Sequence, residues 1–382
     1  MRERLKLINK VKIYGAGSIG NHLAHACRNK GWDVTVCDRD DEALTRMKND
    51  IYPSRYGKWD ESIKLSRDAS GMQTKYFDVV IIGTPPESHV PLALKELKYF
   101  NPEVIMIEKP LSTPDMEGCQ ELFELSEQKG VFVTCSYNHT LTPNTNMASE
   151  LISNGLIKNG KSIHVRWLEH WGGIFDAHPW LDGPQDSYFG FSDRGGGACG
   201  EHSHGISIWQ HFSHLLNQGK ISEVTSTMKI VNDTYDETTQ ILVKSENGII
   251  GTIIQDVVTD PSVKKARIQG EDGYLEWIVN YSDSEDALIC TTYYPSGEGA
   301  FRGRFPKCIP FFKSRPDDFK WEIEHIEDIL DNKTDRDSSP ISLERGLDVM
   351  LVIAAAHLSN ETGKKVKIDY KKGYSLEALN VI

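Results

Sequence analysis

The chain has 382 residues, more than one ordinary domain core holds, so we expect two domains. Its net charge of −12 disfavours nucleic acid and anionic membranes as partners, and no stretch is long and apolar enough for a membrane span. The first ten residues lack the apolar segment of a secretory signal, so we expect a cytoplasmic protein. The seven scattered cysteines then predict thiols rather than disulfides.

The first motif lies between two predicted strands, at residues 10–14 and 33–37. Gly15, Gly17 and Gly20 give a G-x-G-x-x-G pattern that opens a helical sequence. The first glycine allows a tight turn, the second lets the backbone approach a pyrophosphate, and the third lets the helix pack closely on the strand. The unpaired N–H groups at the start of that helix attract phosphate. The pattern therefore predicts a dinucleotide site.

Asp38 directly follows the second predicted strand, at the place of the acid that binds the adenosine ribose. Its carboxylate accepts hydrogen bonds from ribose hydroxyls and repels a 2′-phosphate, which favours NAD. Arg39 is the next residue and could pair with a 2′-phosphate. NADP therefore stays open as an alternative cofactor.

Strands and helices alternate through the first third of the chain. Further strands are predicted at 78–83, 103–107 and 131–135, with helices at 87–98 and 115–129 between them. This order predicts an α/β Rossmann domain, with a doubly wound parallel sheet, over residues 1–138. Ligands bind at the carboxyl ends of such strands. Lys109 lies at one of those ends, where hydride chemistry would occur, although a lysine after a strand is ordinarily a solvated surface charge.

Several of these segments resemble the glucose–fructose oxidoreductase/inositol dehydrogenase family, also called Gfo/Idh/MocA. The resemblance is carried by the glycine motif, the T-P-P-E-S-H turn at 84–89, Glu108-Lys109-Pro110 and Tyr137-Asn138, and their order and spacing fit along essentially the whole chain. It implies that Lys109 contacts the nicotinamide ribose and the substrate and assists proton transfer. The cofactor-binding residues expected from motif and resemblance are Gly15, Gly17, Ser18, Ile19, Gly20, Asp38, Arg39, Thr84, Pro85, His89, Glu108 and Lys109.

For residues 139–382 the resemblance implies an α+β substrate domain with a large, mostly antiparallel open sheet. The free face of that sheet often forms dimers or tetramers, so we expect a homodimer or homotetramer. Alternating apolar runs agree with such a sheet and recur at 162–168, 223–231, 238–244, 249–257, 263–269 and 273–278. A helix is predicted over 342–360, with Ser342 as its N-cap, and in the family it packs back toward the cofactor domain.

A histidine-rich segment follows three glycines at 195–197 and contains Glu201 and His204. Residues three apart share a helix face, and a carboxylate beside an imidazole raises its pKa and suits it to acid–base work. The family motif is a glycine run, an acid and a histidine. A three-residue gap assigns it to Glu201 and His204, whereas the four-residue gap of many members puts Gly200 at the acid position. We predict Glu201 and His204 as catalytic residues beside Lys109.

A subgroup linked to surface-sugar biosynthesis has the three-residue gap after a His-Pro-aromatic element, which residues 178–182 resemble. Polar residues expected to bind substrate are Asn138, His178, Asp182, Tyr188 and His204. A metal site is a weaker interpretation of Cys199, Glu201, His202 and His204, because their spacings match no common zinc motif. We therefore expect no metal.

The function expected from these residues is NAD(P)-dependent interconversion of a hydroxyl and a ketone on a sugar or sugar derivative, such as a surface-glycan precursor. Two alternatives remain open. A tightly bound NAD could be used transiently for a net non-redox sugar reaction such as glycoside cleavage. A non-catalytic cofactor-binding sensor is the other, and its mark would be loss of the motif lysine, whereas Lys109 is present.

Overall fold

The computed structural model describes residues 8–67, 76–176, 178–271, 273–293, 304–314 and 316–382. The chain divides into two compact units: residues 1–113, 117–138 and 316–346 form the first, and residues 114–116, 139–315 and 347–382 form the second. Segment 316–346 therefore belongs to the first unit, although the sequence analysis assigned it to the second domain. Within the described ranges, no helix is both long and apolar enough to cross a membrane.

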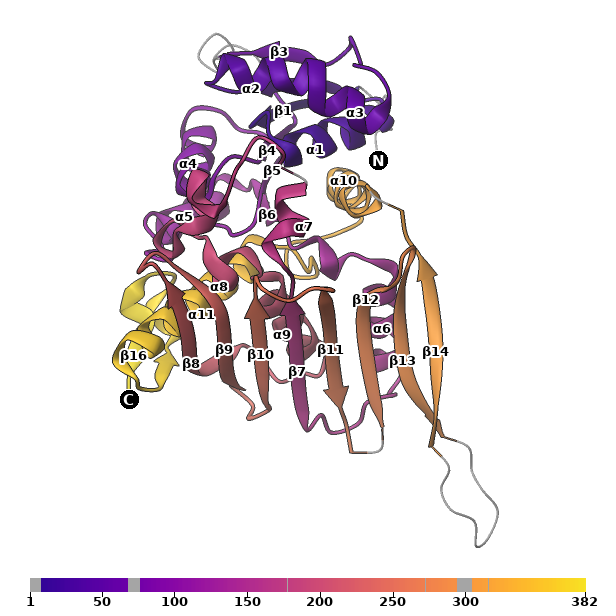
Figure 1. Ribbon diagram of the computed structural model, residues 1–382, viewed down its shortest axis with the longest axis vertical. Coiled ribbons are helices and arrows are strands. Elements are labelled where there is room, and N and C mark those ends of the chain that lie inside the picture. The colour runs from indigo at the N-terminus through magenta and orange to yellow at the C-terminus, as the bar shows by residue number, and fades with distance from the viewer. Residues whose placement is uncertain (1–7, 68–75, 177, 272, 294–303, 315) are drawn as a thin grey trace, which may run out of the picture. The chain divides into compact units, whose positions relative to one another are not determined.

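The first unit contains a six-stranded parallel sheet in the order β3-β2-β1-β4-β5-β6 (Figure 1). Its strands are β1 (Lys10–Tyr14), β2 (Asp33–Cys37), β3 (Lys64–Ser66), β4 (Val79–Ile82), β5 (Val104–Ile107) and β6 (Phe132–Cys135). This is the strand order of a Rossmann domain, so the predicted fold class is confirmed for this unit. Every residue of β4, β5 and β6 is buried, as expected for parallel strands covered on both faces.

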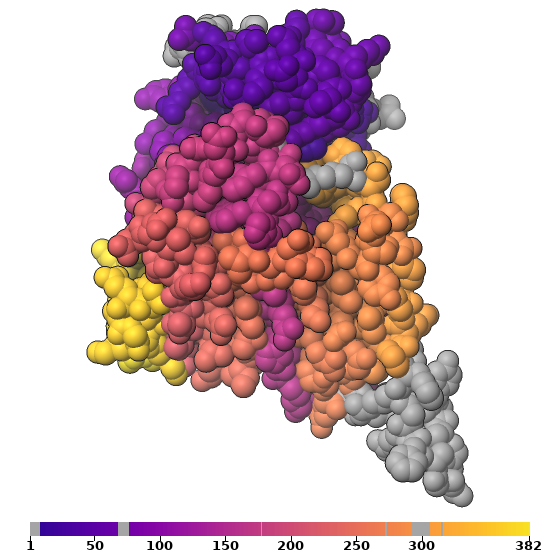
Figure 2. Space-filling model, viewed as in Figure 1, coloured from indigo at the N-terminus to yellow at the C-terminus, as the bar shows by residue number. Residues whose placement is uncertain are grey.

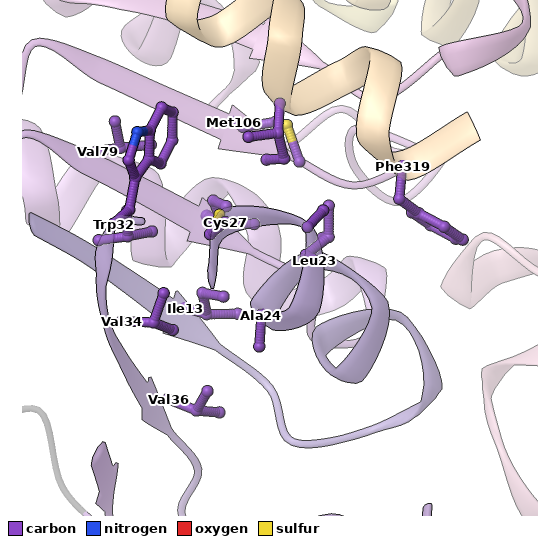
Figure 3. Packing of buried hydrophobic residues seen from close by; sticks show 14 of the residues in the cluster. Ile13, Leu23, Ala24, Cys27, Trp32, Val34, Val36, Val79, Met106 and Phe319 are labelled. Carbon is purple, nitrogen blue, oxygen red and sulfur yellow. The ribbon is translucent and has the colours of Figure 1, made fainter. Parts of the chain in front are cut away.

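Helices connect these strands and supply the layers on the sheet. They are α1 (Ser18–Asn29), α2 (Asp41–Arg46), α3 (Tyr52–Tyr56), α4 (His89–Tyr99), α5 (Cys119–Lys129) and α10 (Asp317–Leu330). Figure 3 shows Leu23, Ala24 and Cys27 of α1 packed with Ile13 and Val34 of the first two strands.

Helix α10 joins the same core from far along the chain. Phe319, Ile323, Ile326 and Ile329 lie one turn apart on one face and are all buried in the core cluster that includes α1 (Figure 3). This apolar spacing predicts a helix, but it does not predict which sheet the helix covers.

The second unit contains a ten-stranded sheet in the order β14-β13-β12-β11-β7-β10-β9-β8-β15-β16 (Figure 1). Its strands are β7 (Ser162–Leu168), β8 (Ile221–Val231), β9 (Tyr235–Ser245), β10 (Ile250–Asp256), β11 (Val263–Gln269), β12 (Tyr274–Ser282), β13 (Glu285–Tyr293), β14 (Arg304–Phe312), β15 (Val366–Ile368) and β16 (Leu379–Val381). Strands β7 and β10 pair in parallel, and the other pairs are antiparallel. The predicted mostly antiparallel sheet is confirmed.

One face of this sheet carries the core of the unit. Along β7, Ile163, Val165 and Trp167 are buried, whereas His164 and Arg166 are exposed. Helix α9 (His204–Leu215) covers the buried face, and the indole of its Trp209 donates to the Ile163 carbonyl oxygen at 2.9 Å. In Figure 2 the strand β7 reaches the surface as a magenta strip among the red and orange strands.

The sequence analysis did not predict β3 in the first unit or strands β13 to β16 in the second. Strand β14 contains Pro306 and Pro310, and proline argues against a strand because it cannot donate to the ladder. The strand lies at the edge of the sheet, where its unpaired side needs no donor. The predicted helix at 342–360 is present as α11 (Leu343–Thr362), and Gly363 follows with a φ of +65°.

Helix α10 also buries an acid, Glu322, whose side chain is inaccessible to solvent. Neither carboxyl oxygen reaches hydrogen-bonding geometry with a described residue, although the Ser136 hydroxyl lies close enough to favour the charged form. Burial, followed by the nearby Glu108 and Asp318 carboxylates, raises the pKa of Glu322 well above its usual range. The folded protein therefore holds a neutral acid here more readily than the unfolded chain does.

This raised pKa predicts a pH-dependent cost of folding. Because the native state binds the Glu322 proton more tightly than the unfolded state, stability falls as pH rises above the unfolded-state pKa of 4.5. Glu322→Gln removes that titration. The free energy of unfolding of the variant, relative to that of the unsubstituted protein, should therefore increase as pH rises. Urea unfolding over a pH series measures this difference, with Glu361→Gln, at an exposed position of α11, as control. Parallel pH profiles for Glu322→Gln and the unsubstituted protein would contradict the assignment.

Candidate dinucleotide and substrate sites

The glycine motif forms the turn between β1 and α1. Gly15 has a φ of +103°, and a Cβ there would lie 2.5 Å from the Gly83 carbonyl oxygen. A Cβ on Gly20 would lie 2.0 Å from the Gly15 carbonyl oxygen. Both glycines are therefore required by the close approach of backbone to backbone. A Cβ on Gly17 would meet no atom within 4 Å, so this glycine borders open space.

Open space at Gly17 is what a bound phosphate needs. Gly17 is the N-cap of α1 and supplies no side-chain cap, which leaves the N–H groups of the first turn without that acceptor. Ser18 begins the helix and is 3% exposed, and the Ile19 side chain packs against the core. The turn has the geometry of a pyrophosphate cradle.

Asp38 lies beside this turn, one residue past β2. One carboxylate oxygen accepts the Ala16 N–H at 2.8 Å, and the other accepts the Asp40 N–H at 3.0 Å. These bonds fix a half-buried carboxylate at the edge of the turn, with lone pairs left for ribose hydroxyls. Arg39 follows it and is exposed.

Three parallel strands end in polar residues at the same edge of the sheet. Thr84 follows β4, Glu108 and Lys109 follow β5, and Asn138 follows β6. Because the carboxyl ends of neighbouring parallel strands lie together, the first unit gathers these side chains on one edge. Asn138 is 8% exposed, and its side-chain oxygen has no hydrogen-bond partner within the described ranges. A bound group would supply that partner.

His89 is fully buried beneath this edge. One ring nitrogen lies 2.9 Å from the Pro110 carbonyl oxygen, and the other lies 2.6 Å from the Thr84 carbonyl oxygen. Burial lowers the pKa of His89 to about 4, so the ring is neutral at pH 7 and donates from one nitrogen. The histidine expected to line the cofactor thus links the turn after β4 to the segment after β5, while Pro85 is exposed.

Glu108 and Lys109 form the start of the loop after β5. Glu108 is 7% exposed, and its carboxylate accepts the backbone N–H of Lys109 at 3.3 Å. Lys109 is half-buried. The thiol of Cys135 lies in the same region, where burial first and the Glu108 charge next raise its pKa well above the usual range. Cys135 is therefore not a nucleophile.

In the second unit, the glycine run at 195–197 leads into the short helix α8 (Gly197–Glu201). A Cβ on Gly196 would lie 2.1 Å from the Tyr188 carbonyl oxygen, so this turn is also closed by backbone contact. Asp236 of β9 anchors it: the carboxylate accepts the Ser192 hydroxyl at 2.8 Å and the Cys199 N–H at 2.7 Å. Asp236 could not be identified from the sequence, because its partners Ser192 and Cys199 lie 44 and 37 residues away.

Glu201 and His204 lie on consecutive helices rather than on one. Glu201 is the last residue of α8 and His204 is the first of α9, so the expectation of a shared helix face is wrong. The break at residues 202–203 changes their relative direction. Glu201 is 9% exposed, and its carboxylate accepts the Tyr188 hydroxyl at 3.0 Å.

His204 lies in an aromatic cluster that the sequence did not predict. Its ring stacks against Trp167 of β7, with centroids 5.2 Å apart and planes 24° apart. The His139 ring meets it edge-on at 4.9 Å. Lys264 places its ammonium 5.7 Å from the Trp167 ring and pairs with Glu169 at 2.7 Å. An imidazole and an indole therefore lie against the His204 ring.

The remaining substrate candidates lie on the segment before the glycine run. Tyr188 is connected to the candidate residues after the glycine run through its hydrogen bond to Glu201. His178 bonds the Ile174 carbonyl oxygen at 2.8 Å and meets the Phe189 ring edge-on at 5.4 Å, which gives it a packing role. Asp182 is exposed. Across the part of the chain that the structure describes, no three His, Cys, Asp or Glu side chains converge as metal ligands do.

Comparison with known proteins adds to this geometry. Residues 9–137 match the family model for Gfo/Idh/MocA proteins, described as an oxidoreductase family with an NAD-binding Rossmann fold. No match to a curated protein sequence was found.

Solved structures resemble the chain over nearly its full length. A levoglucosan dehydrogenase in complex with NADH and levoglucosan has a TM-score of 0.74 and 17% identity, with 94% of this chain and 99% of that chain covered. An NAD-binding oxidoreductase from Klebsiella pneumoniae has a TM-score of 0.73 and 19% identity, with 94% and 99% covered. A UDP-N-acetylglucosamine 3-dehydrogenase from Acidithiobacillus ferrooxidans has a TM-score of 0.70 and 13% identity, with 93% and 98% covered.

At these identities the solved structures show a shared fold. The glycine turn, the fixed Asp38 and the family match over 9–137 agree on the cofactor class. The first unit has an NAD-binding Rossmann fold, and residues 9–137 match the Gfo/Idh/MocA oxidoreductase family.

Proposed function

We propose that this protein is an NAD-dependent oxidoreductase that interconverts a hydroxyl and a ketone on a sugar or sugar derivative. The observation that carries the proposal is the open space at Gly17, beside a fixed Asp38, in a unit whose β5 is followed by Glu108 and Lys109. A purely structural protein gains nothing from a turn that needs two strained or crowded glycines and leaves the third open.

The reaction removes a hydride from carbon and a proton from oxygen. When bound, NAD supplies the hydride acceptor. We assign the transfer of the hydroxyl proton to Lys109 and His204, the two basic side chains that the motifs identify. We assign Glu201, which accepts a hydrogen bond from the Tyr188 hydroxyl, as the acid that acts with His204. Glu108 fixes the Lys109 backbone through its carboxylate.

A sugar is the substrate class that these side chains favour. The half-buried His139 ring offers a flat surface of the kind on which sugar rings pack their C–H faces, and the buried Trp167 supports this ring edge-on. Asn138, His178, Asp182 and Tyr188 provide hydrogen-bonding groups for hydroxyls. Two of the structurally similar proteins are sugar dehydrogenases by name, one for levoglucosan and one for a nucleotide sugar. We extend that class to this chain, including surface-glycan precursors.

The direct test is NADH formation, followed by its absorbance, with free sugars, uronates, cyclitols and nucleotide sugars as substrates. NAD and NADP are compared in parallel. Net reduction with one class identifies the dehydrogenase and its substrate. Bound nicotinamide without net reduction would instead support transient oxidation in a non-redox reaction, and absence of both would reject the proposal.

Replacing Lys109 tests its role in chemistry. Lys109→Ala should lower kcat/KM by about 10²–10⁴-fold, the usual contribution of a proton-transfer residue. NADH affinity, measured by fluorescence titration, should stay close to that of the unsubstituted protein. The exposed Lys129→Ala on α5 controls for loss of a positive charge. Unchanged turnover in Lys109→Ala would overturn the assignment.

Replacing Asp38 tests cofactor choice. Asp38→Ser removes a charged acceptor for the ribose hydroxyls and the repulsion of a 2′-phosphate. The ratio of NADP to NAD affinity should rise by about tenfold or more. Isothermal titration with both cofactors measures this ratio, and the exposed Asp50→Ser is the control. A ratio that does not move means that Asp38 is not the ribose acid.

The exposed face of the ten-stranded sheet suggests a homo-oligomer. Leu242 and Ile250 are each 59% exposed on neighbouring strands β9 and β10. Burying such side chains against a second copy would remove apolar surface from water. Leu242→Glu should therefore lower the mass measured by light scattering toward that of a monomer, whereas Lys129→Glu, at an exposed position of α5 in the first unit, serves as the control. A monomeric mass for the unsubstituted protein would reject this interface.

A further inference from the structure

Arg55 is a cation beside the phosphate-binding turn that no motif identifies. It lies on α3, and its guanidinium donates two hydrogen bonds to Ser18: to the carbonyl oxygen at 2.8 Å and to the hydroxyl oxygen at 2.7 Å. Ser18 is the first residue of α1, directly after the open Gly17. A half-buried positive charge is thus attached to the first turn of the helix that faces the phosphates.

The position of Arg55 is set by its neighbours on α3. Tyr56 stacks on His25 of α1 with centroids 3.6 Å apart and planes 4° apart, and its hydroxyl lies 2.5 Å from a ring nitrogen of His22. The Tyr52 hydroxyl lies 3.1 Å from a ring nitrogen of His25. These contacts hold α3 against α1 on both sides of Arg55. The guanidinium therefore loses little conformational entropy when a ligand binds.

The approach to α3 is also unusual. Residues Met47–Ile51, between α2 and α3, form a π-helical turn. Such turns are rare and are frequently found at functional sites. Here the turn leads directly into the helix that presents Arg55.

The hydrogen bond to Ser18 also defines what the serine can do. Its hydroxyl oxygen accepts from Arg55, and no described residue accepts the hydroxyl hydrogen. A hydroxyl that accepts from a cation is a stronger donor through its own proton. At the start of α1, an incoming phosphate oxygen is an acceptor of the right charge.

We propose that Arg55 is a cofactor-binding residue that acts with Ser18 on the diphosphate of the dinucleotide. The guanidinium adds a permanent positive charge to the turn and orients the Ser18 hydroxyl to donate to a phosphate oxygen. The ligand feature that it recognises is the diphosphate, not the base or the nicotinamide. The inference rests on NAD binding at the glycine turn, as proposed above.

Binding to the nucleotide-free protein tests this pairing. Arg55→Gln should weaken both NADH and ADP-ribose by about tenfold and by the same factor, because both carry the diphosphate. Arg55→Lys, which keeps the charge but not the two-pronged contact, should recover part of the affinity. The affinity of the unsubstituted protein should fall more steeply with added salt than that of Arg55→Gln. Lys98→Gln, an exposed lysine paired with Glu121 on the same unit, controls for charge.

Ser18→Ala completes a double-mutant cycle. If the two residues act together, their effects are not additive. The affinity of the double variant should then be close to that of the weaker-binding single variant. Thermal unfolding of the ligand-free variants checks folding, and Ser18→Ala decides the outcome if Arg55→Gln is unfolded.

Three results would overturn the proposal. Unchanged affinity for both probes in folded Arg55→Gln removes the role of the arginine. Weakening of NADH alone would assign Arg55 to the nicotinamide half. Failure of the unsubstituted protein to bind either probe would reject NAD binding itself, and this inference with it.

Discussion

The backbone contacts at Gly15 and Gly20 are the constraint on which the first unit depends. A side chain at either position would strike a carbonyl oxygen at 2.5 Å or less. Because these contacts bring β1, the turn after β4 and α1 together, they set the position of the helix whose first turn receives phosphate. The open space at Gly17 is a consequence of the same packing, because the turn is crowded at Gly15 and Gly20 and open at Gly17.

The second unit uses the same device with a different anchor. Gly196 and Gly200 approach carbonyl oxygens to within 2.2 Å of a hypothetical Cβ, and Asp236 takes the place that a second backbone segment has in the first unit. Each glycine turn leads into the residues with chemistry: Ser18 in one case, Glu201 and His204 in the other. In both units, backbone packing fixes the segments that carry these candidate residues, which reduces the cost of ordering them on binding.

Local sequence predicted what depends on local geometry. Apart from β3, α2 and α3, the order of strands and helices up to β6 was predicted from the sequence, as were the glycine turn and the polar ends of β5 and β6. Long-range placement was not predictable: α10 packs on a sheet whose last strand ends nearly 200 residues earlier. The separation of Glu201 and His204 onto two helices depends on a break that the residues at 202–203 do not announce. His139, Trp167 and Asp236 acquire their roles only through partners from other strands and helices.

The two units are interleaved in the chain, and this affects the order in which the protein can be made. The six strands of the parallel sheet are complete by Cys135, but the apolar residues of α10 come after Pro316. During synthesis, the core around α1 therefore lacks its last helix until strands β7 to β14 of the ten-stranded sheet have emerged. The cofactor domain closes late although it is encoded first, so a ribosome-bound chain cannot offer a finished Rossmann core until most of the substrate domain exists.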